Sequence, residues 1–145
     1  MTKSIEEVLS FIHRVPLFQG LSKKQIEYLA KRFIERKYGV GDAITTQGRG
    51  GEGFLIVVSG KAEVVREKAD GTKAVVNNFG PKDFFGEIAL LDDGVRTASV
   101  MTTEPTECLV LVRWDFLAVV RGDPEIAITI LQELAKRLRM VLDTM

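Results

Sequence analysis

Short apolar runs broken by turn residues fill the middle of the chain, and they restrict it to a mainly β core. From about Tyr38 onward, Gly and Asp interrupt runs rich in Val, Ile and Phe. Such runs predict strands, and several in succession predict a barrel, a roll or a sandwich. Asp70-Gly71 lies between two of the runs and predicts a tight hairpin. The strands are predicted at residues 43–47, 53–59, 62–68, 73–78, 97–103 and 107–113.

Helices are predicted on both sides of this β core. Apolar residues at helical spacing indicate a first helix that begins near Ile5. Ser22 and Gln25 have the spacing of a capping box, so a second helix is predicted there, with an apolar stripe that runs to Phe33. The order of elements is therefore helices, strands and again a helix.

The final helix is predicted from Asp123 onward, with Asp123 as N-cap and Pro124 in the first helical position. It carries an apolar seam whose members are alternately four and three residues apart, as in a short heptad pattern. Either this helix packs on its own domain, or it also pairs with a second subunit to give a homodimer. The seam consists of Ala127, Leu131, Leu134, Leu138, Val141 and Met145.

Composition excludes several functions. The chain of 145 residues has 20 Lys plus Arg and 20 Asp plus Glu, a formal net charge of zero, so direct binding of nucleic acid by the chain is not expected. A lone cysteine allows no intrachain disulfide. Neither a signal peptide nor an apolar run of about 20 residues is visible, so we expect a cytoplasmic protein without a membrane partner.

The sequence offers little for catalysis. Its single histidine, His13, cannot build a multi-histidine metal site, and we predict no catalytic residue, no metal and no enzymatic activity. The stretch 49–53 is rich in glycine but lacks the Gly-Lys-Ser/Thr ending of a triphosphate-binding loop, so it is predicted to be a flexible turn. Cys108 and Trp114 alternate with valines and are predicted to be core residues of a strand.

The segment 84–100 carries the chemistry. Gly86 allows close approach of a backbone to a ligand, and the residues after it can form a helical turn with N–H groups available to an anion. The planar guanidinium of Arg96 can donate hydrogen bonds to two phosphate oxygens at once, and the Glu87 carboxylate can accept a hydrogen bond from a sugar hydroxyl. The residue types alone also allow a second interpretation, a structural ion pair between Glu87 and Arg96.

The string FGEIALLDDGVRTASV resembles the phosphate-binding cassette of cyclic nucleotide-binding domains, and the resemblance extends over roughly residues 15–138. It implies a mainly β fold with flanking helices, a double-stranded, jelly-roll-like β-helix or β-roll with N-terminal helices and a C-terminal lid helix. The family often has Gly before the Asp that precedes the cassette, whereas here the run is Gly80-Pro81-Lys82-Asp83, so the bend is expected at Gly80-Pro81. The implied single domain covers 1–145, with N-terminal helices at 1–37, the β-roll at 38–114, the cassette at 84–100 and C-terminal helices at 115–145.

The resemblance also implies roles for individual residues. Glu87 is expected to accept the ribose 2′-hydroxyl, and Arg96 to neutralise the cyclic phosphate. Thr97 is expected at the phosphate or at a guanine base, and its presence leaves cAMP and cGMP open. Further hydrogen bonds are expected from backbone N–H groups near Gly86, Ile88, Ala89 and Ala98, and a cover over the base from Leu131, Leu134 or Leu138.

Together these expectations describe a regulatory domain. Binding of cAMP or cGMP, as a ligand and not as a cofactor, would move the C-terminal helix and alter its contact with an effector protein that the sequence does not reveal. The alternative is a protein-interaction scaffold of the same fold that no longer binds nucleotide. Glu87 and Arg96 argue against this alternative, because both are costly to bury without partners.

Overall fold

The computed structural model of the protein describes residues 5–50, 53–92 and 94–145. The predicted glycine-rich turn at 49–53 and the cassette therefore each contain positions outside the described residues, namely 51–52 and 93. The chain divides into two compact parts, a β part (Phe33–Arg113) and a helical part (Met1–Arg32 with Trp114–Met145). Along the described chain, no helix combines the length and the apolar character needed to cross a bilayer.

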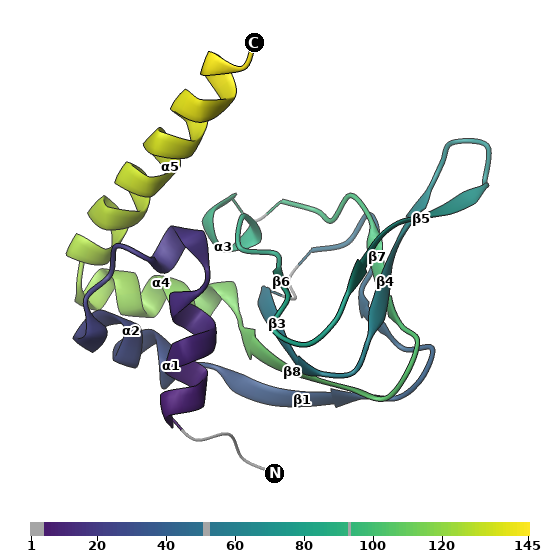
Figure 1. The fold of residues 1–145 in the computed structure, drawn as a ribbon, viewed down its shortest axis with the longest axis horizontal. Helices are drawn as coiled ribbons and strands as arrows, with labels where there is room; N and C mark the ends of the chain where they lie inside the picture. The colour runs from purple at the N-terminus through teal and green to yellow at the C-terminus, as the bar shows by residue number, and fades with distance from the viewer. Residues whose placement is uncertain (1–4, 51–52, 93) are drawn as a thin grey trace. The chain divides into compact units, whose positions relative to one another are not determined.

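The β part consists of two four-stranded antiparallel sheets, which confirms the mainly β class and the β-roll with flanking helices (Figure 1). One sheet has the order β1-β8-β3-β6 and the other has the order β2-β7-β4-β5. Strands that are far apart in sequence are thus neighbours in both sheets. The strands are β1 (Ile34–Tyr38), β2 (Ala43–Thr45), β3 (Phe54–Ser59), β4 (Ala62–Glu67), β5 (Lys73–Phe79), β6 (Phe84–Phe85), β7 (Ser99–Thr102) and β8 (Thr106–Leu111).

The core of the β part is built around β3, whose first four residues are all buried. Leu55 and Val57 join an apolar cluster, and Phe54 lies in ring contact with Phe33 and Phe84, with centroids 6.0 Å apart in each pair. Side chains on both faces of the strand are therefore removed from water, which accounts for its uninterrupted apolar sequence. The cluster consists of Ile44, Leu55, Val57, Ala62, Val100, Cys108 and Val110.

The predicted hairpin is confirmed between β4 and β5. Gly71 has φ +85° and donates its N–H to the Lys68 carbonyl at 2.9 Å. The Asp70 carboxylate accepts both the N–H and the hydroxyl of Thr72, at 2.9 and 2.6 Å, and these bonds, the one from the hydroxyl first, lower the pKa of Asp70. The turn chemistry of Asp-Gly therefore determines where the chain reverses.

The bend before the cassette differs from the expectation in one detail. Residues 80–83 form the expected turn, closed by a bond of 3.1 Å from the Asp83 N–H to the Gly80 carbonyl. However, the residue with positive φ is Lys82, at +75°. Pro81 precedes it, so the geometry corresponds to a type II turn, in which this position normally belongs to Gly or Asn.

Because Lys82 is strained, Lys82→Gly is expected to stabilise the protein. Relief of about 1–2 kcal/mol of left-handed strain outweighs the added freedom of the unfolded chain, about 0.4–1 kcal/mol. The free energy of unfolding should therefore rise by about 0.5–1 kcal/mol. Urea denaturation measures this, and a decrease in the denaturation midpoint would contradict the assignment of strain.

The helical part contains α1 (Ile5–His13), a short 3₁₀ turn η1 (Pro16–Phe18), α2 (Lys23–Ala30), α4 (Arg113–Gly122) and α5 (Glu125–Asp143). The predicted capping box is confirmed. Ser22 Oγ accepts the Gln25 N–H at 3.2 Å, and Gln25 Oε1 accepts the Ser22 N–H at 2.9 Å. Asp123 Oδ1 accepts the Glu125 N–H at 3.2 Å, but α5 begins at Glu125 and its N-cap is Pro124, one residue later than predicted.

Two further predictions about where elements end were wrong. The helices were expected to extend to residue 37, but α2 ends at Ala30, and residues 34–38 form β1, which pairs with β8. The sequence IERKY lacks a clear apolar alternation, so only its partner strand reveals it as a strand. Trp114 was expected in a strand core but lies in α4 with 75% of its surface exposed. β8 ends at Leu111, and the alternation in the sequence continues beyond the strand.

Cys108, by contrast, is a buried core residue of β8, as predicted. Burial raises the pKa of its thiol from 9.0 to about 12. A thiol reagent at pH 8 is therefore expected to modify the unfolded chain but not the native protein. The absorbance of released thionitrobenzoate measures this modification, and rapid labelling of the native protein would contradict the burial of Cys108.

The raised pKa also predicts how stability depends on pH. Between pH 9 and 12 the Cys108 thiol ionises only in the unfolded chain, so the free energy of unfolding should fall as the pH rises through this range.

Candidate functional site

Six of the seven predicted binding residues line one pocket at an edge of the β part. Its volume is about 540 Å³, within the range of about 300–1,000 Å³ that is usual for small-molecule sites. The lining comes from residues 84–89, 92 and 94–97. Ala98, the seventh predicted residue, lies just before β7 and is outside the lining. The fold therefore brings together the two ends of the cassette.

Arg96 is held at this pocket by its backbone. Its N–H donates to the Arg49 carbonyl at 2.8 Å, and its own carbonyl accepts the Gly48 N–H at 2.8 Å. The half-buried guanidinium also donates from Nη2 to the carbonyl of Gly53. Both chain segments that flank residues 51–52 thus position the arginine. Because a carbonyl of the protein holds one side of the planar fork, the guanidinium has a preferred orientation before any ligand binds.

Gly86 lies directly against this guanidinium. Its φ is +87°, a conformation that side chains other than that of glycine rarely adopt. A β-carbon at this position would collide with Arg96 Nη1 and would lie 2.6 Å from the Gly53 carbonyl oxygen. Gly86 is therefore required both by its backbone conformation and by the space that the arginine occupies.

Glu87 and Ile88 lead from Gly86 into the short helix α3 (Ala89–Asp92). Glu87 is half-buried and lines the pocket, whereas the Ile88 side chain is largely exposed. The Ala89 N–H already donates to the Gly86 carbonyl at 3.1 Å. Within the described part of the chain, the N–H groups of Gly86, Ile88 and Ala98 form no backbone hydrogen bond. Of the predicted backbone donors, these three can therefore be offered to a ligand without breaking a bond.

Gln47 connects the segment that follows Thr97 to strand β4. The Gln47 N–H donates to Ser99 Oγ at 2.8 Å. Its side-chain amide bridges to β4, with Nε2 donating to the Glu67 carbonyl at 2.9 Å and Oε1 accepting the Glu67 N–H at 2.7 Å. Thr97, two residues before Ser99, lines the pocket and is exposed. The predicted hydroxyl is thus available at the position that the sequence indicated.

Sequence reasoning did not single out two residues at this site. Gly53 was interpreted as part of a flexible turn and as the start of a strand, yet its carbonyl accepts a hydrogen bond from the guanidinium of Arg96. A backbone acceptor leaves no signal in residue type, so no pattern could have identified it. Val95 is an exposed apolar residue of the lining, immediately before the arginine. Its apolar character was the available signal, because small-molecule pockets are lined mainly by apolar side chains.

The predicted cover residues lie on α5 in the helical part. Leu131 and Leu138 are 62% and 60% exposed, and Leu134 is half-buried. Ile126 and Ile130 instead bury their side chains in their own part. α5 therefore has one apolar face in its own core and further leucines at the surface.

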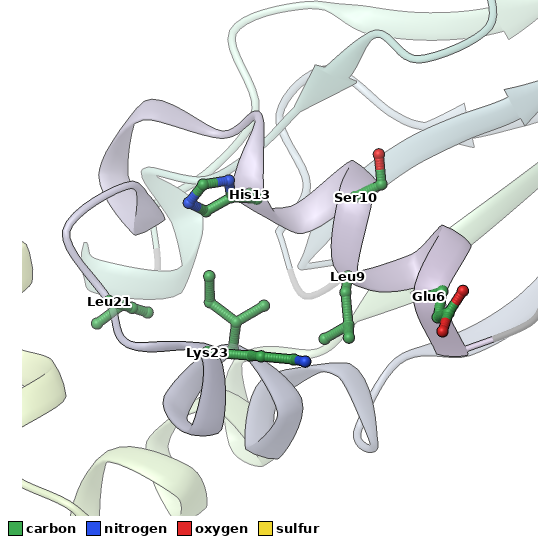
Figure 2. A pocket seen from close by; sticks show the side chains of 7 residues that line it. Glu6, Leu9, Ser10, His13, Leu21 and Lys23 are labelled. Carbon is green, nitrogen blue, oxygen red and sulfur yellow. The ribbon is translucent and has the colours of Figure 1, made fainter.

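A second pocket, of about 310 Å³, lies in the helical part between α1 and the start of α2 (Figure 2). Figure 2 shows Glu6, Leu9, Ser10 and His13 along α1, with Leu21 and Lys23 facing them across the pocket. Every polar residue of this lining is exposed, whereas the cassette pocket has a half-buried arginine and a half-buried glutamate. The cassette pocket is therefore the stronger candidate site.

The fold and the cassette pocket together define a β-roll module with an arginine at a small concave site. The family model described as "Cyclic nucleotide-binding domain" matches residues 35–123, more than half of the chain, and the protein belongs to this family. The relatives that it matches include a receptor protein and a kinase regulatory subunit, and it spans only a part of each.

Individual relatives agree with this assignment. The chain is 39% identical over 124 residues to the cyclic AMP receptor protein of Thermus thermophilus, covering 86% of this chain and 57% of the relative. It is 37% identical over 97 residues to the regulatory subunit of cAMP-dependent protein kinase from Mycosarcoma maydis, covering 67% and 18%. The crystal structure of the N-terminal domain of a transcriptional regulator from Streptomyces coelicolor A3(2) superposes with a TM-score of 0.83 at 30% identity, covering 92% of this chain and 94% of that one. The chain thus spans little more than half of its receptor relative.

Proposed function

We propose that the protein senses a cyclic nucleotide, cAMP or cGMP, in the pocket of residues 84–97. Arg96 neutralises the cyclic phosphate, and Glu87 accepts the ribose 2′-hydroxyl. The backbone N–H groups of Gly86, Ile88 and Ala98 donate to the ligand, while Ala89 shapes the turn around it. Thr97 offers its hydroxyl to the phosphate or to the base. The protein acts by binding and carries out no reaction on the ligand.

The orientation of the Arg96 guanidinium is the observation that carries this proposal. The guanidinium donates to the Gly53 carbonyl and occupies the space where residue 86 would carry a β-carbon, so it is held inside the concave lining. A preoriented fork reduces the entropy lost when a phosphate binds, which favours affinity for a small anion.

The binding test is calorimetric titration of the protein with cAMP and with cGMP. Saturable binding with one site per chain supports the proposal, and the ratio of the two dissociation constants gives the base preference. If a folded sample binds neither nucleotide, the sensor proposal is wrong and the scaffold alternative is adopted.

We further propose that binding is transmitted through α5, with Leu131, Leu134 or Leu138 covering the base. A ligand can shift the equilibrium between the state in which α5 covers the base and the state in which it does not only by binding the covered state more tightly. The exposure of Leu131 and Leu138 means that these side chains gain burial if α5 covers a bound base. The altered surface of α5 then acts on an effector protein or on a second copy of the chain through the seam from Ala127 to Met145.

Saturating nucleotide is therefore expected to slow hydrogen exchange in residues 125–143. The slowing should follow occupancy of the pocket, and Arg96→Ala at the same nucleotide concentration should show little of it. Hydrogen-exchange mass spectrometry of the free and bound protein makes the measurement. Unchanged exchange in α5 at full occupancy would disprove transmission through this helix while leaving the binding proposal intact.

A further inference from the structure

Gln47 bridges two strands of one sheet at the point where the strand between them begins. In the sheet of order β2-β7-β4-β5, β7 lies between β2 and β4 (Figure 1). Gln47 follows the last residue of β2, and its side-chain amide bonds to both backbone groups of Glu67, the last residue of β4. Its own N–H donates to Oγ of Ser99, the first residue of β7, at 2.8 Å. The side chain therefore crosses the sheet directly before β7 begins.

The register of β4 with β7 shows which residue the Gln47 side chain replaces. The two strands pair as far as Val65 and Ser99. Two residues further, the same antiparallel register would set Thr97 opposite Glu67. In a hydrogen-bonded antiparallel pair, the two residues exchange both N–H···O bonds. The Gln47 amide makes this same pair of bonds with Glu67, at 2.9 and 2.7 Å, so β7 begins at Ser99 and Thr97 lines the pocket instead.

The turn that contains Gln47 also holds the backbone of Arg96. Residues 46–49 form a turn that is closed by a hydrogen bond of 3.0 Å between its ends, with Gly48 at φ +82°. The Gly48 N–H donates to the Arg96 carbonyl, and the Arg96 N–H donates to the Arg49 carbonyl, each at 2.8 Å. Gln47 thus connects β4 to the two residues that hold Arg96 in place.

We propose that Gln47 is a positioning residue for Arg96. Because its amide takes the backbone groups of Glu67, it stops β7 two residues short and directs residues 96–97 away from the sheet and toward the pocket. Through its turn, it also fixes the backbone from which the Arg96 side chain extends. Gln47 is not among the described residues of the pocket lining, so it acts through Arg96 and not by contact with a ligand.

The two bonds between Gln47 and Glu67 contribute more to position than to overall stability. Glu67 is exposed, and both bonds lie at the surface. Water can solvate the Glu67 backbone when the amide is removed, so the free energy of unfolding should change little. A water molecule on Glu67 does not, however, tie β4 to the turn at 46–49. Removal of the amide should therefore loosen Arg96 while the protein stays folded.

Hydrogen exchange in the nucleotide-free protein tests the positioning directly. Gln47→Met retains an unbranched side chain of similar size but loses both bonds to Glu67. We expect the Arg96 and Gly48 amides to exchange about tenfold faster in this variant, measured by NMR relative to the Leu55 amide in the buried strand β3. An unchanged ratio would overturn the proposal.

Ser22→Ala is the control for a general loss of stability. It removes the capping box at the start of α2, in the helical part, and so lowers the free energy of unfolding without touching the turn at 46–49. The exchange ratio of Arg96 to Leu55 should therefore stay as it is in the unmodified chain. An increase equal to that of Gln47→Met would show that the ratio reports stability alone, and the proposal would be wrong.

Calorimetric titration tests the consequence for affinity, which rests on the proposed nucleotide binding. Gln47→Met should weaken binding about tenfold in the unmodified chain but less than about twofold when Arg96 is already alanine, because residues that act as one unit are not additive. Equal weakening in both backgrounds would overturn the proposal, since Gln47 would then act without Arg96. If the unmodified chain binds neither nucleotide, the proposed function fails, and the exchange ratio by itself decides whether Gln47 positions Arg96.

Discussion

Arg96→Ala is expected to weaken cyclic nucleotide binding by roughly 10- to 150-fold. The substitution removes a charged hydrogen-bond donor, whose loss costs about 1.5–3 kcal/mol, and 1.4 kcal/mol corresponds to tenfold in affinity. The effect should appear in both cAMP and cGMP titrations, because the phosphate is common to the two ligands. Calorimetric titration measures it, with the heat of unfolding as a check that the variant is folded.

Two further variants give this prediction its controls. Arg66→Ala removes an exposed arginine from β4, outside the pocket lining, and should leave the affinity unchanged. Arg96→Lys keeps the charge but loses the planar fork that donates to the Gly53 carbonyl, so its affinity should lie between those of the alanine variant and the unmodified protein. If folded Arg96→Ala binds as tightly as the unmodified protein, Arg96 does not contact the phosphate.

Gly86→Ala is expected to reduce stability and binding together. The left-handed backbone alone should cost about 1–2 kcal/mol of folding free energy. In addition, the new β-carbon displaces the guanidinium of Arg96 from the place that it occupies against Gly86. Affinity should therefore fall by about as much as in Arg96→Ala, roughly 10- to 150-fold, because the same phosphate contact is lost.

Gly71→Ala is the matched control for this variant. Gly71 has φ +85°, close to the +87° of Gly86, but no atom lies within 4 Å of the position that its β-carbon would take. It should therefore show the backbone cost of about 1–2 kcal/mol without a change in affinity. Chemical denaturation and titration of both variants separate the two effects. Equal affinities in the two variants would show that the space beside Gly86 does not position Arg96.

The local features of the fold were predictable where a few neighbouring residues determine them. The capping box at Ser22 and the Asp70-Gly71 hairpin follow from hydrogen bonds within three residues, and both are observed. β1 was missed because its five residues become a strand only through their pairing with β8, about 70 residues later. The exposure of Trp114 was missed for a related reason, since an alternating pattern does not show where a strand ends and a helix begins.

The candidate site divides in the same way. The string from Phe84 to Val100 predicts Glu87 and Arg96 as ligand contacts, which stays a prediction, and six of the seven predicted binding residues share one pocket. The sequence could not show that a backbone carbonyl, that of Gly53, holds the guanidinium. Its interpretation of the bend at 80–83 also missed that Lys82 takes the left-handed conformation.

The sequence by itself thus determined the class of the fold, the element order and the identities of the charged groups, because periodicity, turn chemistry and residue type are local properties. Only the tertiary structure decided that Gly53 and Gly86 enclose the Arg96 guanidinium and that the Gln47 side chain bonds to the backbone of β4. These arrangements join chain segments far apart in sequence. They arise from how the sheets pair and close, which no single stretch of residues encodes.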